Sequence, residues 1–145
     1  MIRPYPWLEF DVHGVPSPQG SKRAYVRNGR ANLVEVAGTA LKDWRTSVAF
    51  TARAAIVDQD WAIVDDGPVE VEILFRMPRP KSRPEDFWHA VRPDIDKLTR
   101  AVLDALTTAR VWRDDSQVSD LVVMKHYATA VSPPGAMIAV GRTQT

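Results

Sequence analysis

The stretch RPDIDKLTRAVLDALTTA, residues 92–109, carries the strongest structural signal in the chain. Pro93 disfavours a helical conformation at Arg92, so the chain should enter this stretch extended. Beyond it, apolar residues recur every three or four positions, which is the spacing of one buried helical face. We therefore predict a helix over 95–109. Its buried face would consist of Leu98, Ala101, Val102, Ala105, Leu106 and Ala109.

Alternation of apolar and polar residues on both sides of this helix predicts β-strands. Asn28-Gly29 is typical of a hairpin turn between two of them. The segment 39–57 lacks Pro and Gly and repeats apolar residues at helical spacing, which predicts another helix. Two main helices packed on a mixed or antiparallel sheet indicate the α+β class. The predicted strands are Trp7–Val12, 24–26, 31–36, Val69–Met77, 118–130 and 136–140.

Composition restricts the class of protein. A length of 145 residues predicts one domain spanning 1–145. The formal charge of +1 means that any contact with nucleic acid must come from local basic clusters. The absence of cysteine excludes disulfides, thiolate metal sites and cysteine nucleophiles. No apolar run resembles a signal peptide or a membrane span, so we expect a cytoplasmic protein with no membrane partner.

Two short acidic segments flank the predicted helix. Asp94 and Asp96 stand at its start, and Asp114 and Asp115 follow it. In extended chain, Asp94 and Asp96 point to the same side, whereas the successive Asp114 and Asp115 point to opposite sides. Only one residue of the second pair is therefore expected to join the first. The six residues 110–115 can retrace a helix of about 20 Å only if they run back nearly straight.

Converging carboxylates repel one another, and a divalent cation is the usual reason for holding them together. Oxygen ligands without His or Cys favour Mg²⁺, with Mn²⁺ as the other candidate. Such a site indicates phosphodiester hydrolysis. A second interpretation is purely structural. Asp94 would then cap the helix, and Asp96 would favour the helix dipole or form an i,i+4 ion pair with Arg100.

The stretch RPDIDKLTRAVLDAL (92–106), followed by VWRDDSQV (111–118) and by Lys125, resembles the signature of the RusA family of Holliday-junction resolvases. The segment GVPSPQGSKR (14–23) is similar to the N-terminal loop of that family. The family consists of small homodimeric, magnesium-dependent endodeoxyribonucleases, often carried by prophages, that resolve four-way DNA junctions by paired nicks. The resemblance implies metal ligands at Asp94, Asp96 and Asp115. Asp114 is a weaker candidate.

Two positions depart from the family pattern without removing a carboxylate. The family commonly has Asn where this chain has Lys97, and Lys where it has Arg100. A guanidinium stays protonated, so Arg100 is expected to bind phosphate or to support the acidic cluster rather than to donate a proton. Our candidates for catalysis are therefore Asp94, Asp96, Asp115 and Arg100.

Basic residues gather in the hairpin region and in the proline-rich stretch 79–92, where they can meet DNA phosphates. In the same stretch, Phe87 and Trp88 could stack on bases exposed at the junction centre, or pack as a hydrophobic anchor. The three histidines are scattered and are interpreted as structural. The DNA-binding candidates are Lys22, Arg23, Arg27, Lys81, Arg83, Arg92 and Lys125.

The sequence thus predicts a homodimeric, Mg²⁺-dependent endodeoxyribonuclease that resolves four-way DNA junctions. One alternative is a metal nuclease that acts on flaps, forks or single strands. Another is a catalytically inactive DNA-binding protein of the same fold. The intact carboxylates argue against the inactive protein, because a pure binder gains nothing from negative charge that faces a polyanion.

Overall fold

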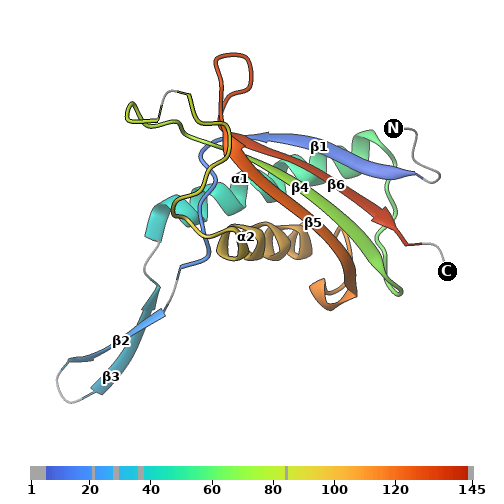
Figure 1. Cartoon of the computed structure of the whole chain (residues 1–145). Coiled ribbons are helices and arrows are strands. Elements are labelled where there is room, and N and C mark those ends of the chain that lie inside the picture. Colours follow the sequence, from blue (N-terminus) through green and yellow to red (C-terminus); the bar gives the residue numbers. More distant parts are fainter. Residues whose placement is uncertain (1–5, 21, 28–29, 36–37, 84, 144–145) are drawn as a thin grey trace.

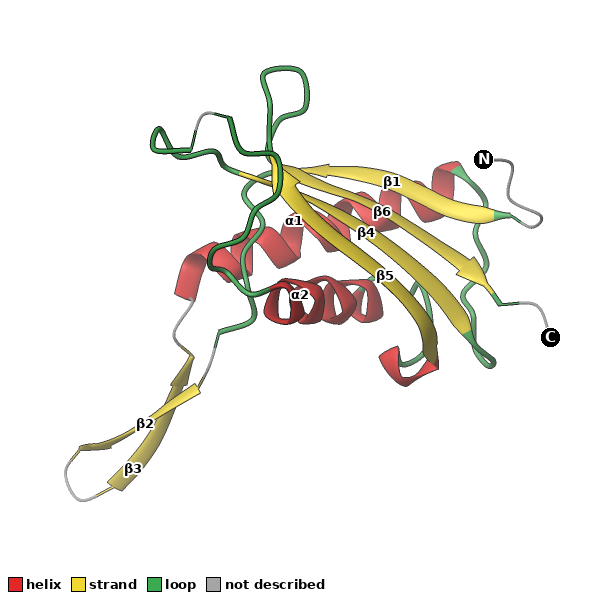
Figure 2. Ribbon diagram, viewed as in Figure 1, coloured by secondary structure: helices red, strands yellow, loops and turns green. Residues whose placement is uncertain are grey.

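A four-stranded mixed sheet forms one layer of the protein, shown in Figures 1 and 2. The computed structural model describes residues 6–20, 22–27, 30–35, 38–83 and 85–143, with 22–35 described for the backbone only. The strand order is β1-β6-β4-β5. Strand β6 runs antiparallel to β1 and β4, whereas β4 and β5 run parallel. The strands are β1 Trp7–His13, β4 Val69–Met77, β5 Val118–Tyr127 and β6 Gly135–Arg142.

Two helices cover one face of this sheet (Figure 1), and the predicted α+β class is confirmed. Helix α1 spans Gly38–Asp58 and helix α2 spans Ile95–Thr108. Helix α2 ends one residue before the predicted boundary, because Ala109 is its C-cap residue. The predicted apolar stripe of α2 is buried in the core, together with Trp44 of α1. Neither of the two described helices is long and apolar enough to cross a bilayer.

The predicted hairpin is also confirmed. Strands β2 Lys22–Arg27 and β3 Arg30–Glu35 pair antiparallel. Figure 2 shows this hairpin standing away from the sheet and the two helices. Its turn at Asn28-Gly29 lies outside the described residues.

The connection from β4 to β5 places the acidic segments. Parallel neighbouring strands require a crossover, and here the loop 78–94, helix α2 and the short 3-10 helix η1 Asp115–Gln117 provide it. Asp94 therefore lies where the loop enters α2, and Asp115 lies where the chain turns into β5. Strand β5 ends at Tyr127, earlier than predicted, because Thr129 and Ser132 hydrogen-bond to each other and close a tight turn.

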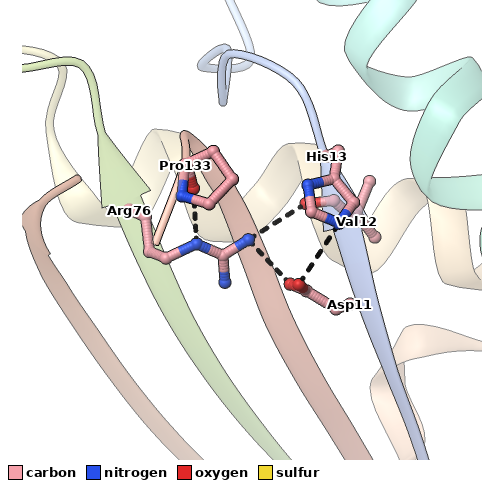
Figure 3. A network of polar contacts seen from close by, with 5 residues as sticks. All are labelled: Asp11, Val12, His13, Arg76 and Pro133. Atoms are coloured by element: carbon pink, nitrogen blue, oxygen red, sulfur yellow. Dashed lines mark hydrogen bonds and ion pairs between the residues drawn. The ribbon is translucent and has the colours of Figure 1, made fainter. Parts of the chain in front are cut away.

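A buried arginine joins this turn to two strands, as Figure 3 shows. The guanidinium of Arg76 donates from Nε to the Pro133 carbonyl over 2.6 Å and from Nη2 to Asp11 over 2.7 Å. Gly135 leaves space for these contacts, since a Cβ there would press against the Val12 carbonyl and the Arg76 guanidinium. The network fixes the β5–β6 turn to β1 and β4.

Candidate acidic active site

Asp94 and Asp96 stand at the exposed N-terminus of α2. Asp94 is the N-cap residue, with extended backbone at φ −69° and ψ 142°, but its side chain makes no capping hydrogen bond. Within the described residues, Arg100 forms no salt bridge with Asp96 or Asp104. Side-chain capping and i,i+4 ion pairs therefore do not explain these carboxylates, whereas Asp96 does stand in the first turn of α2, where the helix dipole favours it.

Asp115 returns to the side of α2 after the helix has ended. It shares an open cleft of about 560 Å³ with Asp96 and Arg100. The chain after α2 thus runs back along the helix, as the length argument requires. The remaining walls of the cleft come from Ile95, Thr99, Leu103, Leu121 and Val123.

The neighbouring Asp114 serves the local fold. Its side chain accepts a hydrogen bond from the Ser116 backbone N–H over 3.0 Å and caps η1. This backbone donor, ahead of smaller contributions from side chains, holds the pKa of Asp114 below its ordinary value. Asp114 and Asp115 therefore have different roles, in line with their predicted opposite orientations.

The sequence offers Ser116 and Gln117 either as supports of Asp115 or as parts of a turn, and in the structure Gln117 holds the Asp115 segment in place. Its Oε1 accepts from the backbone N–H groups of Arg113 and Asp114, over 3.0 and 2.9 Å. Its Nε2 donates to the carbonyls of Val64 and Gly67, over 2.9 and 3.0 Å. The Asp-x-x-Gln spacing at 114–117 is a capping-box signal from which the first half of this role could have been predicted.

Negative charge is crowded around Asp115. Burial raises the pKa of Asp115, and so do the side chain of Asp114 and the charge of Asp104, whereas Arg100 opposes the rise. A bound cation would relieve this repulsion.

Asp94 faces a second hollow, of about 550 Å³, that also touches Pro18, Arg92 and Lys97. The N-terminal loop reaches this place because the Gln19 backbone N–H donates to the Lys97 carbonyl over 2.9 Å. Across the described parts of the chain, no three His, Asp or Glu side chains lie close enough to hold one metal ion. The structure thus brings Asp96 and Asp115 to one cleft and leaves Asp94 on the adjoining hollow.

Lys125 contacts the backbone just before Asp94. Its Nζ donates to the carbonyls of Val91 and Pro93, each over 2.7 Å. Burial lowers the pKa of Lys125, and the nearby Asp94 carboxylate counteracts this. The sequence leaves Lys125 pointing either toward the acidic site or toward DNA, and in the structure its ammonium group contacts the backbone beside Asp94.

The other basic candidates are more dispersed. Lys81, Arg83 and Arg92 are exposed in the loop 78–94. Arg83 forms an ion pair with Asp86, with 3.3 Å between Nη1 and Oδ2. The side chains of Lys22, Arg23 and Arg27 lie outside the described residues.

Exposed carboxylates lie beside Arg100 on a small α+β fold, next to a loop that carries exposed cations. Comparison with known families identifies the class of protein as a nuclease. The family described as "Endodeoxyribonuclease RusA" matches residues 16–140, so the chain belongs to the RusA family.

Individual relatives cover most of the chain. The crossover junction endodeoxyribonuclease RusA of Escherichia coli (strain K12) is 33% identical over 111 residues, which is 77% of this chain and 78% of that protein. The protein of the same name from Enterobacteria phage 82 is 32% identical over 111 residues, with the same coverage of 77% and 78%. The Bacillus subtilis (strain 168) protein YqaN is 30% identical over 132 residues, covering 83% of this chain and 88% of YqaN.

Proposed function

We propose that the protein is a homodimeric, Mg²⁺-dependent endonuclease that resolves four-way DNA junctions by paired symmetric nicks, with Mn²⁺ able to replace Mg²⁺. The names of the relatives support the junction as substrate. One observation carries the hydrolytic site: Asp96, Asp115 and Arg100 line a single open cleft, and the Asp94 side chain beside it is not used for capping.

The donor set fits a hard divalent cation. Asp96 and Asp115, which line one cleft, would hold it, and Asp94 on the adjoining hollow would have to turn toward them to complete the set of three. Carboxylate oxygens without sulfur or imidazole ligands suit Mg²⁺ and Mn²⁺. Burial raises the pKa of Asp115, and the negative charges of Asp114 and Asp104 add to the rise, so a cation at this place would be favoured. When bound, the ion supplies Lewis-acid activation of the attacking water and neutralises charge on the cleaved phosphate.

The protein's own residues supply position and charge. Arg100 would bind the phosphate in the cleft, where its fixed positive charge also moderates repulsion between the carboxylates. Lys125 holds the segment before Asp94, and Gln117 holds the segment that carries Asp115. Together these contacts would keep the two acidic segments in register for in-line attack.

Two-fold symmetry suits the proposed substrate. A dimer presents two equivalent sites, and paired nicks on opposing strands require two sites. Phosphate contacts would fix the register of the DNA, and the shape and deformability of the junction would select it. The exposed Lys81, Arg83 and Arg92 are our candidates for such contacts, with Lys22, Arg23 and Arg27 of the hairpin.

The test is nicking of a labelled four-way junction against a linear duplex of matched sequence, in Mg²⁺, in Mn²⁺ and in chelator. Symmetric, metal-dependent cuts in the junction alone are expected. Asp94→Asn, Asp96→Asn and Asp115→Asn should each abolish cleavage and leave junction binding intact or tighter, since a negative charge facing phosphate is removed. Asp114→Asn is the matched control, because Asn still caps η1 and cleavage should persist.

Three other outcomes would contradict the proposal. Binding without cleavage in either metal would indicate the inactive DNA-binding protein. Preferential cutting of flaps, forks or single strands would indicate the broader nuclease. Equal loss of folding and binding in the three aspartate variants would support the structural interpretation of these carboxylates.

A further inference from the structure

Two adjacent aromatic side chains of the loop 78–94 project into solvent. Phe87 is 56% exposed and Trp88 is 59% exposed. Their ring centroids lie 4.9 Å apart at an interplanar angle of 76°, and the Phe87 ring lies 4.8 Å from that of His126 on β5. Adjoining exposed rings of this size point to a binding surface.

The loop that carries these rings is braced. Phe87 accepts a backbone hydrogen bond from Tyr127 over 2.8 Å, and Trp88 forms a short antiparallel bridge with His126. Arg79 ties the loop together from within, because its guanidinium donates to the carbonyls of Arg83, Asp86 and Ala128. The two rings are therefore displayed on a preorganised frame, which lowers the entropy cost of binding.

The same frame connects the rings to the acidic segment. The Lys125 carbonyl accepts from the His89 backbone N–H over 3.3 Å. The Lys125 ammonium donates to the carbonyls of Val91 and Pro93, next to Asp94. Strand β5 thus fixes the chain at both ends of the short stretch between Trp88 and Asp94, so the rings have a defined position relative to the proposed site.

We propose that Phe87 and Trp88 form a stacking platform for an unpaired nucleobase at the branch point of the DNA. This inference rests on the proposed function for the presence of a branch. Aromatic rings accept the face of any base, so the platform needs no sequence preference. Lys81 and Arg92 lie exposed in the same loop, where their charges attract the phosphates on either side of an unpaired base.

The test uses a four-way junction with 2-aminopurine at the branch point, titrated with the full-length protein in chelator so that no strand is cut. Transfer of the base onto the platform should change its fluorescence for wild type but not for Phe87→Ala/Trp88→Ala. Loss of stacking for one base corresponds to a loss of roughly 5- to 150-fold in junction affinity for the double variant. Trp88→Phe should restore most of the signal.

A matched control separates stacking from general exposure of aromatic side chains. Phe50 is 71% exposed on α1, and Phe50→Ala should change neither the fluorescence nor the affinity. Affinity for linear duplex should match wild type in every variant, and the loop should keep its place, because the backbone contacts of Phe87 and Trp88 persist after truncation.

Two outcomes would overturn the platform, and a third would separate it from the proposed function. One is junction cleavage by wild type with no change in 2-aminopurine fluorescence, which would leave the proposed function standing. Another is dissociation of the double variant into smaller species on sedimentation, which would assign the rings to a subunit interface. If the fluorescence responds in wild type only, but no junction is ever cleaved in metal, the platform is supported and the proposed function fails.

Discussion

Replacing Lys125 by methionine separates a positioning role from direct DNA binding. The substitution keeps the apolar stem of the side chain and removes the ammonium group, which makes two hydrogen bonds of 2.7 Å. A hydrogen bond from a charged donor contributes about 1.5–3 kcal/mol to stability. The two carbonyls can partly rehydrate, since Val91 is 43% exposed. We therefore expect the free energy of unfolding to fall by about 2–3 kcal/mol, near the lower end of the sum of the two bonds.

Urea denaturation measures the change in the free energy of unfolding, and the junction-nicking assay measures the change in cleavage rate. Loosening the segment before Asp94 should lower the cleavage rate at least about tenfold, since misplacement of about 1 Å has large effects on catalysis. Junction affinity in chelator, and its dependence on salt, should stay close to wild type.

The opposite pattern would refute this reasoning. If Lys125 contacts a phosphate, the plot of log affinity against log salt concentration should become less steep by about 0.9, with unfolding unchanged. Lys81→Met is the matched control, because Lys81 is an exposed lysine of the same loop. That variant should change the salt dependence and leave stability alone.

Three further predictions concern the frame around the site. Gln117→Leu removes four hydrogen bonds and should lower the free energy of unfolding by about 2–4 kcal/mol, measured by urea denaturation. The same variant should also lose cleavage activity, measured by junction nicking. Arg76→Met removes the arginine partner of Asp11 and leaves only His13, at 3.5 Å, beside this partly buried carboxylate. Stability should fall by about 3 kcal/mol, whereas unchanged unfolding would show that the Arg76–Asp11 ion pair contributes nothing. Burial, and then the charge of Lys125, lower the pKa of His89, so the unfolded chain takes up a proton before the folded one. The contribution of His89 to stability should therefore be fully present above about pH 6.5. Below that pH it should be lost, by at most about 1.4 kcal/mol per pH unit. Thermal melts at several pH values should show a weaker loss for His89→Phe than for wild type.

The secondary structure was largely predictable because it rests on local periodicity. The stripe from Leu98 to Leu106 requires a helix, and the alternation in Val69–Met77 requires a strand. Boundaries were less predictable. Strand β5 ends at Tyr127 because hydrogen bonds between Thr129 and Ser132 close a turn there, which no alternation pattern reports.

The acidic residues could be predicted as a group but not as individual roles. Their spacing on either side of one helix, with the family signature, identified Asp94, Asp96 and Asp115 as candidates. Which side chain faces which hollow depends on the backbone of η1, which turns Asp114 into a cap and Asp115 toward Asp96. The different roles of Asp114 and Asp115 depend on the geometry of one local turn, which cannot be predicted from composition or motif spacing.

The sequence by itself determined the α+β class, the family and the identity of the carboxylates, because periodicity and motif spacing are properties of neighbouring residues. Only the tertiary structure decided what the long-range partners do. The sequence left Lys125 pointing either toward the acidic site or toward DNA, and the parallel pairing of β4 and β5 carries its ammonium group to the carbonyls of Val91 and Pro93, beside Asp94. The contacts of Gln117 likewise exist only in the packed structure, because its side-chain amide donates to the carbonyls of Val64 and Gly67. These contacts join residues 32 to 53 positions apart, and their geometry exists only once the sheet and helices have packed.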